Sequence, residues 1–218
     1  MSEKPDSDSG GMAGLTALKK SWFQVPEETS LSFCDVIEAR MFNARVVPIS
    51  GEIEEFGAAL FTGQMQALAE SDADVTLLLT SNGGSVEAGG AYIRAIRHAQ
   101  SAGCTVIGEV RGYAMSMASV ILQACDVRTA APEDIVMVHG FVGTSVGDIR
   151  NTEADAALMK KFTEVYAKLY AARSTAEEDE YRTEEYWTKL LKDSLPHYYF
   201  GEEALEKGLI DALVVEEK

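Results

Sequence analysis

The sequence predicts a single α/β domain built on a mainly parallel sheet. Between Arg45 and His139, short apolar runs rich in β-branched residues alternate with segments of helical periodicity. This alternation implies right-handed crossovers between parallel strands, with helices covering the sheet. The chain has 218 residues, of which 46% are hydrophobic, enough to bury a sizeable core. We expect the compact domain to span residues 31–218, after a polar, flexible segment at residues 1–30.

The elements follow in a regular order. The pattern predicts strands at residues 46–49, 75–80, 105–110, 126–130 and 134–139. Helices are predicted between them, at residues 56–71, 85–100 and 116–124, and a short helix and an apolar strand close the chain after residue 201.

A long helix is predicted at residues 151–173, where Thr152 and Asp155 have the spacing of a capping box. An apolar stripe runs along it, made of Leu158, Phe162, Val165, Tyr166 and Leu169. Such a stripe is typical of a helix that packs on its own sheet. The alternative is a helix that contacts another subunit. The acidic segment that follows is expected to be a solvated helix face.

The composition argues against several classes of protein. A formal net charge of −16 is unfavourable for binding a phosphate backbone, so nucleic acid is not an expected partner. No apolar run is long enough to suggest a membrane span, and the N-terminus has no secretory-signal pattern. The three cysteines, Cys34, Cys104 and Cys125, are widely spaced and lie among apolar residues, which favours free thiols in the cytoplasm.

Three short motifs could carry chemistry. In "TSNGGSVEAGG", a strand runs into a turn at Asn82, Gly83 and Gly84 and then into a helix start, where free N–H groups can face an anion. In "GYAMSMAS", Ser116 lies at a strand-to-helix junction among small residues, whereas Ser119 is interpreted as a small packing residue of the helix. In "MVHG", His139 ends a strand. Each motif alone is more often structural: a plain turn, a helix cap or an exposed histidine.

Together, "SNGGSVEAGGAY", "GYAMSMAS", "MVHG" and "EEALEKGLID" resemble the proteolytic subunit of the Clp protease family, over about residues 45–211. The resemblance implies a crotonase-like ββα spiral with parallel sheets, flanking helices and a protruding handle helix at about 151–173. It implies a serine endopeptidase in which Ser116 is the nucleophile and His139 the general base. The N–H groups of Gly84 and Met117 would form the oxyanion hole.

The resemblance also implies that the chain assembles with copies of itself and works without a cofactor. Members form two stacked seven-membered rings around a closed chamber, hydrolyse polypeptides, and need no metal or organic cofactor. The chain has no P-loop, so ATP-dependent proteolysis would require a separate AAA+ unfoldase ring, and residues 1–30 could supply axial loops.

The third member of the catalytic triad is the main departure from the family. Pro196 occupies the position where the family has its aspartate, and Asp193 is the nearest upstream carboxylate, so Asp193 is the candidate acid. Asn82 also stands where members of the family commonly have a proline. These two departures indicate a divergent member of the family. Four alternatives stay open: a phage-type peptidase or a signal-peptide-peptidase-like enzyme acting without an unfoldase, an inactive scaffold subunit, and a non-proteolytic crotonase-type enzyme.

Overall fold

The computed structural model describes residues 32–143, 146–193 and 195–214. The expected flexible segment and axial loops at residues 1–30 lie outside the described residues. The chain divides into two units, Met1–Arg40 and Met41–Lys218. Helix α2 (Phe33–Asn43) crosses their boundary, and the fold described below is that of the second unit.

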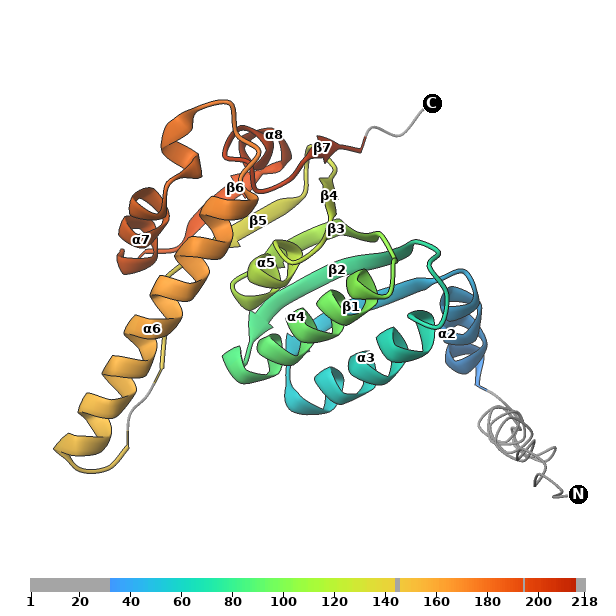
Figure 1. Cartoon of the computed structure of the whole chain (residues 1–218), viewed down its shortest axis with the longest axis horizontal. Helices are drawn as coiled ribbons and strands as arrows, with labels where there is room; N and C mark the ends of the chain where they lie inside the picture. The colour runs from blue at the N-terminus through green and yellow to red at the C-terminus, as the bar shows by residue number, and fades with distance from the viewer. Residues whose placement is uncertain (1–31, 144–145, 194, 215–218) are drawn as a thin grey trace, which may run out of the picture. The chain divides into compact units, whose positions relative to one another are not determined.

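A mainly parallel sheet forms the centre of this unit, as the sequence predicts (Figure 1). Its strands β1, β2, β3, β4 and β7 lie side by side in that order and are all parallel. They span Val46–Ile53, Val75–Gly84, Val106–Met115, Val127–Ala130 and Ala212–Leu213, respectively.

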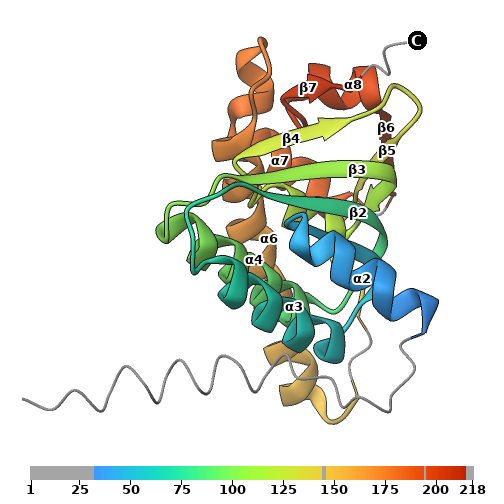
Figure 2. The same ribbon diagram turned by 90° about the vertical axis from the view of Figure 1, so that its right-hand side faces the viewer.

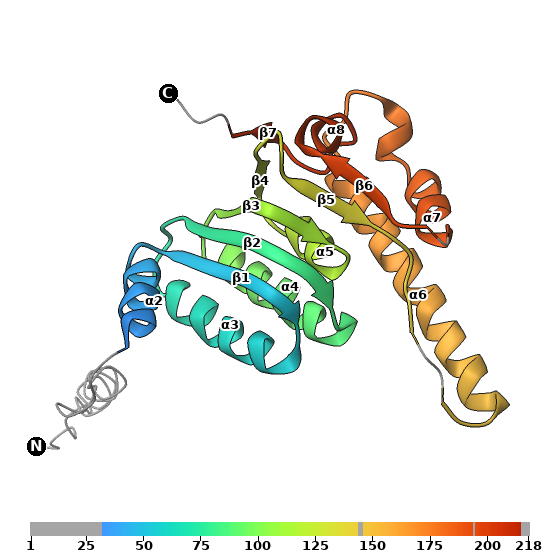
Figure 3. The ribbon, with the colours of Figure 1, turned by 180° about the vertical axis from the view of Figure 1, so that it is seen from behind.

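The sheet divides at strand β3. Its first half pairs with β4, and its second half pairs with β5 (Ile135–Val138), also in parallel. Strand β6 (His197–Phe200) then pairs with β5 in the antiparallel direction. Figure 3 shows β5 and β6 leaving the line of the other strands. The sequence analysis did not predict β6, since "HYYF" is too short to show an alternating pattern.

Helices α3 (Glu55–Leu68) and α4 (Val86–Ser101) cover one face of the sheet, and Figure 2 shows them below its strands. Helix α4 turns residues such as Tyr92, Ile96 and Ala99 inward, at the spacing that one helix face requires. The six-residue helix α5 (Met117–Leu122) is buried along its whole length. This burial agrees with its lack of polar side chains apart from Ser119.

Helix α6 (Ile149–Arg173) begins two residues earlier than predicted, because Asp148 is its N-cap and accepts hydrogen bonds from the N–H groups of Arg150 and Asn151. Its buried residues all belong to its C-terminal half, and its other half projects away from the sheet (Figures 1 and 3). Two residues of the predicted apolar stripe remain exposed, Leu158 at 43% and Val165 at 56%. Within the chain, α6 therefore packs on the sheet over only part of its length.

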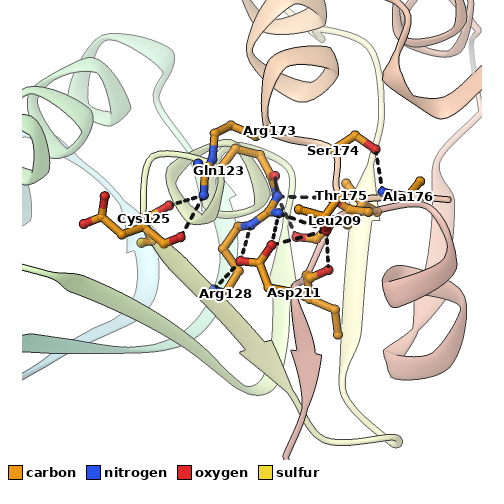
Figure 4. A network of polar contacts seen from close by, with 12 residues as sticks. Gln123, Cys125, Arg128, Arg173, Ser174, Thr175, Ala176, Leu209 and Asp211 are labelled. Atoms are coloured by element: carbon orange, nitrogen blue, oxygen red, sulfur yellow. Dashed lines mark hydrogen bonds and ion pairs between the residues drawn. The ribbon is translucent and has the colours of Figure 1, made fainter. Parts of the chain in front are cut away.

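The C-terminal segment is joined to the sheet by a buried guanidinium (Figure 4). The Arg128 side chain on β4 is fully buried and pairs with Asp211, just before β7. It also donates to the side chain of Gln123 and to the carbonyl of Gly208, at 3.1 Å in the latter case. The elements η1 (Asp179–Arg182), α7 (Glu184–Lys192) and α8 (Gly201–Glu206) complete the described chain.

Candidate active site

Ser116 and His139 meet where two neighbouring strands end. Ser116 follows β3 and His139 follows β5, and Met115 is opposite Met137 in the register of this parallel pair. Parallel neighbours end at the same edge of a sheet, so the two side chains are brought together. The Nε2 atom of His139 lies 2.8 Å from the Oγ atom of Ser116, which is hydrogen-bonding distance for a nucleophile and its base.

The backbone of Ser116 is strained. Its φ is 53° and its ψ is −123°, a conformation that costs a non-glycine residue about 1–3 kcal/mol. Although Ser116 occupies the N-cap position of α5, its side chain makes no capping hydrogen bond. The hydroxyl is turned toward His139 instead, which distinguishes Ser116 from the helix cap considered in the sequence analysis.

The glycine turn at the end of β2, made of Gly83 and Gly84, lies directly against this serine. A Cβ atom added to Gly83 would lie 2.6 Å from the Cβ of Ser116 and 2.8 Å from the amide nitrogen of Met117. Gly83 also has a φ of +92°, which favours glycine. The fully buried Ser81 holds the turn by accepting a hydrogen bond from the Gly83 N–H at 3.1 Å and donating to the Gly51 carbonyl at 2.6 Å.

A small cavity of about 70 Å³ opens beside Ser116. Gly84, Met117 and His139 line it with Ser116, so four of the five predicted site residues surround one space. The Met117 N–H has no hydrogen-bond acceptor among the described residues, as is usual for the first turn of a helix. It is therefore available to a bound oxygen. The remaining walls are mostly apolar, from Val86, Val120, Phe141, Val142, Tyr166, Tyr170 and Leu191.

Asp193 is not among the residues that line this cavity. It follows α7, and its carboxylate lies 3.3 Å from the Nε2 atom of His197. Among the described residues, the only hydrogen bond of the His139 ring is the one with Ser116. The backbone at the end of α7 is nevertheless close, since a Cβ added to Gly140 would lie 2.3 Å from the carbonyl oxygen of Leu191. The role of Asp193 stays a prediction.

Two polar side chains that the sequence did not predict to take part in the site, Ser119 and Tyr170, form hydrogen bonds next to Ser116. Ser119 is fully buried, and its hydroxyl donates to the Ser116 carbonyl at 2.7 Å. The hydroxyl of Tyr170, from α6, lies 2.6 Å from the Ser119 Oγ. Ser119 is thus a small helix residue, as predicted, that also takes part in a hydrogen-bond chain. The sequence carries no signal for this pair, because the two residues are far apart in the chain.

Comparisons with known proteins identify the family of the chain. The profile described as Clp protease matches residues 29–217. This chain belongs to the Clp protease family. One relative is the ATP-dependent Clp protease proteolytic subunit of Porphyromonas gingivalis (strain ATCC BAA-308 / W83), which is 29% identical over 194 residues. The match covers 86% of this chain and 82% of the relative.

Membership in the Clp family makes the chain a peptidase of the Clp type, with the predicted α/β fold. Among the described residues, no group of three or more His, Cys, Asp or Glu side chains could hold a metal ion. In the same part of the chain, no helix is both long and apolar enough to cross a membrane.

Proposed function

We propose that this Clp family member is a serine endopeptidase that hydrolyses peptide bonds of unfolded proteins or peptides through an acyl-enzyme. The observation that carries the proposal is the 2.8 Å contact between the Ser116 Oγ and the His139 Nε2. It is supported by the strained φ of Ser116 and by the close glycine turn.

In the first step, the Ser116 oxygen attacks the carbonyl carbon of the peptide bond while His139 takes the hydroxyl proton. The N–H groups of Gly84 and Met117 stabilise the negative charge that develops on the carbonyl oxygen. His139 then gives its proton to the leaving amine, and the C–N bond breaks. In the second step, water gives a proton to His139 and attacks the ester carbonyl. The bond between this carbon and the Ser116 Oγ then breaks, His139 returns the proton to the Oγ, and the new carboxyl end is released.

Asp193 is proposed as the group that orients the His139 ring, which would require it to leave His197. The pairing of Asp193 with His197 is the observation that favours a second candidate function, that of an inactive scaffold subunit. A crotonase-type enzyme has less support, because it needs a carboxylate in its site and none of the described residues that line the cavity is acidic. A peptidase with a lysine base is also disfavoured, since Lys160 and Lys161 lie on the half of α6 that projects from the sheet.

We further propose that the chain works as a homo-oligomer of stacked rings in the cytoplasm. Leu158 on the projecting half of α6 is exposed, and so is Val165 further along the helix, as expected of a helix that contacts another subunit. The relative is named an ATP-dependent proteolytic subunit. By analogy with it, a separate AAA+ unfoldase would deliver polypeptides to this chain.

The test is labelling with a fluorophosphonate, which reacts with activated serines. We expect one label per chain, at Ser116 by peptide mass spectrometry, and none on the Ser116→Ala variant. A His139→Gln variant should retain the fold but react far more slowly, because the base is lost. Equal labelling of the wild-type protein and Ser116→Ala would refute the nucleophile assignment.

A further inference from the structure

We propose that Ser119 and Tyr170 are positioning residues that aim the Met117 N–H at the oxyanion. This inference rests on the proposed function, since it concerns the same reaction. Among the described residues, neither side chain is hydrogen-bonded to the Ser116 hydroxyl or to the His139 ring.

The direction of the hydrogen bonds follows from counting protons. A hydroxyl has one proton to donate, and it accepts through its lone pairs. The Ser119 hydroxyl gives its proton to the Ser116 carbonyl at 2.7 Å, because a carbonyl can only accept. The 2.6 Å contact between Ser119 and Tyr170 must then be donated by Tyr170. The chain therefore runs from Tyr170 through Ser119 to the carbonyl of Ser116.

Tyr170 is held firmly at the start of this chain. Its side chain is 1% exposed, and its ring stacks on Trp187 of α7 with the ring centres 4.9 Å apart. Burial raises the pKa of Tyr170 above its usual range, so its hydroxyl keeps the proton that it donates. Hydrogen bonds in such a chain polarise and strengthen one another.

The carbonyl of Ser116 and the N–H of Met117 belong to the same peptide unit. A trans peptide is planar, so its C=O and N–H point in opposite directions and turn together. The carbonyl also accepts from the N–H groups of Ser119 at 3.0 Å and Val120 at 3.3 Å. The Ser119 hydroxyl adds a third donor on this side. Fixing the carbonyl therefore fixes the direction of the Met117 N–H, which has no other partner among the described residues.

A strained peptide needs such support. The φ of 53° at Ser116 is stable only where neighbouring contacts determine it. Without the Ser119 hydroxyl, the peptide unit could rotate toward a relaxed conformation and turn the Met117 N–H away from the cavity. The oxyanion would then lose part of its stabilisation, while the binding of the ground-state substrate would change little.

The experiment measures the rate of fluorophosphonate labelling over a range of probe concentrations. This gives the limiting rate separately from the probe concentration at half-saturation. Tyr170→Phe keeps the ring and its stacking, and Ser119→Ala keeps a small side chain. We expect each variant to lower the limiting rate by about three- to tenfold, the effect of losing one buried hydrogen bond, with half-saturation unchanged. The double variant should be no slower than the slower single variant, because the groups form one chain.

A second readout is the affinity for a peptide boronate, whose tetrahedral adduct with serine places an oxygen in the oxyanion hole. We expect this affinity to fall by the same factor as the limiting rate. Thr163→Val is the matched control, since Thr163 is a buried residue of α6 whose hydroxyl, within the described part of the chain, bonds only to Met159 of the same helix. A purely structural role would lower the melting temperature of the variants without lowering the limiting rate of the folded protein.

The outcomes separate the two proposals. Labelling of Tyr170→Phe and Ser119→Ala at the wild-type limiting rate overturns the positioning role alone. Additive losses in the double variant overturn the chain that joins the two residues. Absence of labelling at Ser116 in the wild-type protein overturns the proposed function and this inference with it.

Discussion

Replacing Arg128 by methionine should destabilise the fold strongly, because Arg128 joins the sheet to the C-terminal segment (Figure 4). The Arg128 side chain has no exposed surface, while that of Asp211 is 23% exposed. Losing one partner of a buried pair costs about 3–5 kcal/mol. We expect the low end, about 3 kcal/mol, because two hydrogen bonds to Asp211 do not depend on the guanidinium. The carboxylate accepts one from the backbone N–H of residue 128 at 2.8 Å and one from the Thr175 hydroxyl at 3.2 Å.

The pH dependence identifies the cause of this loss. Burial alone would raise the pKa of Asp211, but the hydrogen bonds and charge of Arg128 lower it below its usual range. In the wild-type protein the carboxylate therefore contributes stability above the unfolded pKa, near 3.9, and this contribution is lost as the pH falls through the folded pKa. In Arg128→Met only burial and weaker donors remain, so the pKa of Asp211 rises. The difference between the two proteins should be largest at pH 7 and should shrink toward pH 3.

The assay is urea unfolding followed by circular dichroism, at one fixed protein concentration because the proposed assembly would also contribute stability. The matched variants are Asp211→Asn and the double variant Arg128→Met/Asp211→Asn. We expect the double variant to be at least as stable as Arg128→Met, because the unpaired carboxylate is gone. A loss under about 1 kcal/mol, or the same loss at pH 7 as near pH 3, would show that the ion pair does not hold the segment.

Three further outcomes can be measured with the same protein. Gly83→Ala should lower the peptidase rate by about 100-fold, since the added Cβ displaces Ser116, whereas Gly90→Ala, whose Cβ would meet nothing within 4 Å, should not. Asp193→Asn should lower the rate by orders of magnitude if its carboxylate orients the imidazole, and an unchanged rate would assign that role elsewhere. Burial raises the pKa of the Cys125 thiol to about 12, so a thiol reagent at pH 8 should modify it only after unfolding, and rapid modification of the native protein would contradict this.

The parts of the fold and site that could be predicted from sequence depend on local pattern. Alternating apolar strands and helices indicate a parallel sheet, and the ends of parallel strands lie at one edge. Ser116 and His139 each follow such a strand, so their proximity was predictable once the two strands were placed as neighbours. The start of α6 was predicted less well, because Asp148 and Thr152 are both good N-cap residues and only the structure shows that Asp148 caps the helix.

The acid of the triad could not be predicted from local sequence pattern, because its place depends on how helices pack. Asp193 follows α7, and its carboxylate lies beside His197, while the backbone at the end of α7 passes close to Gly140, which follows β5. The position of Asp193 is set by the packing of α7 on α6, where Trp187 stacks on Tyr170. No spacing in the sequence encodes that packing, so the resemblance to the family, which predicts the acid at the position of Pro196, could not identify the acid.

The contacts around Ser116 rank the substitutions that should disturb it. Gly83 lies against the serine itself, Ser119 bonds to the serine carbonyl, and the Tyr170 hydroxyl bonds to Ser119. A clash with backbone cannot be relieved by a rotamer change, whereas the carbonyl retains two backbone donors when the Ser119 hydroxyl is lost. The loss of limiting rate should therefore decrease from Gly83→Ala through Ser119→Ala to Tyr170→Phe. This order follows from the strain at Ser116, because several contacts together hold its conformation. Losing the contact that is most distant from the serine, the Tyr170 hydroxyl, should disturb that conformation least.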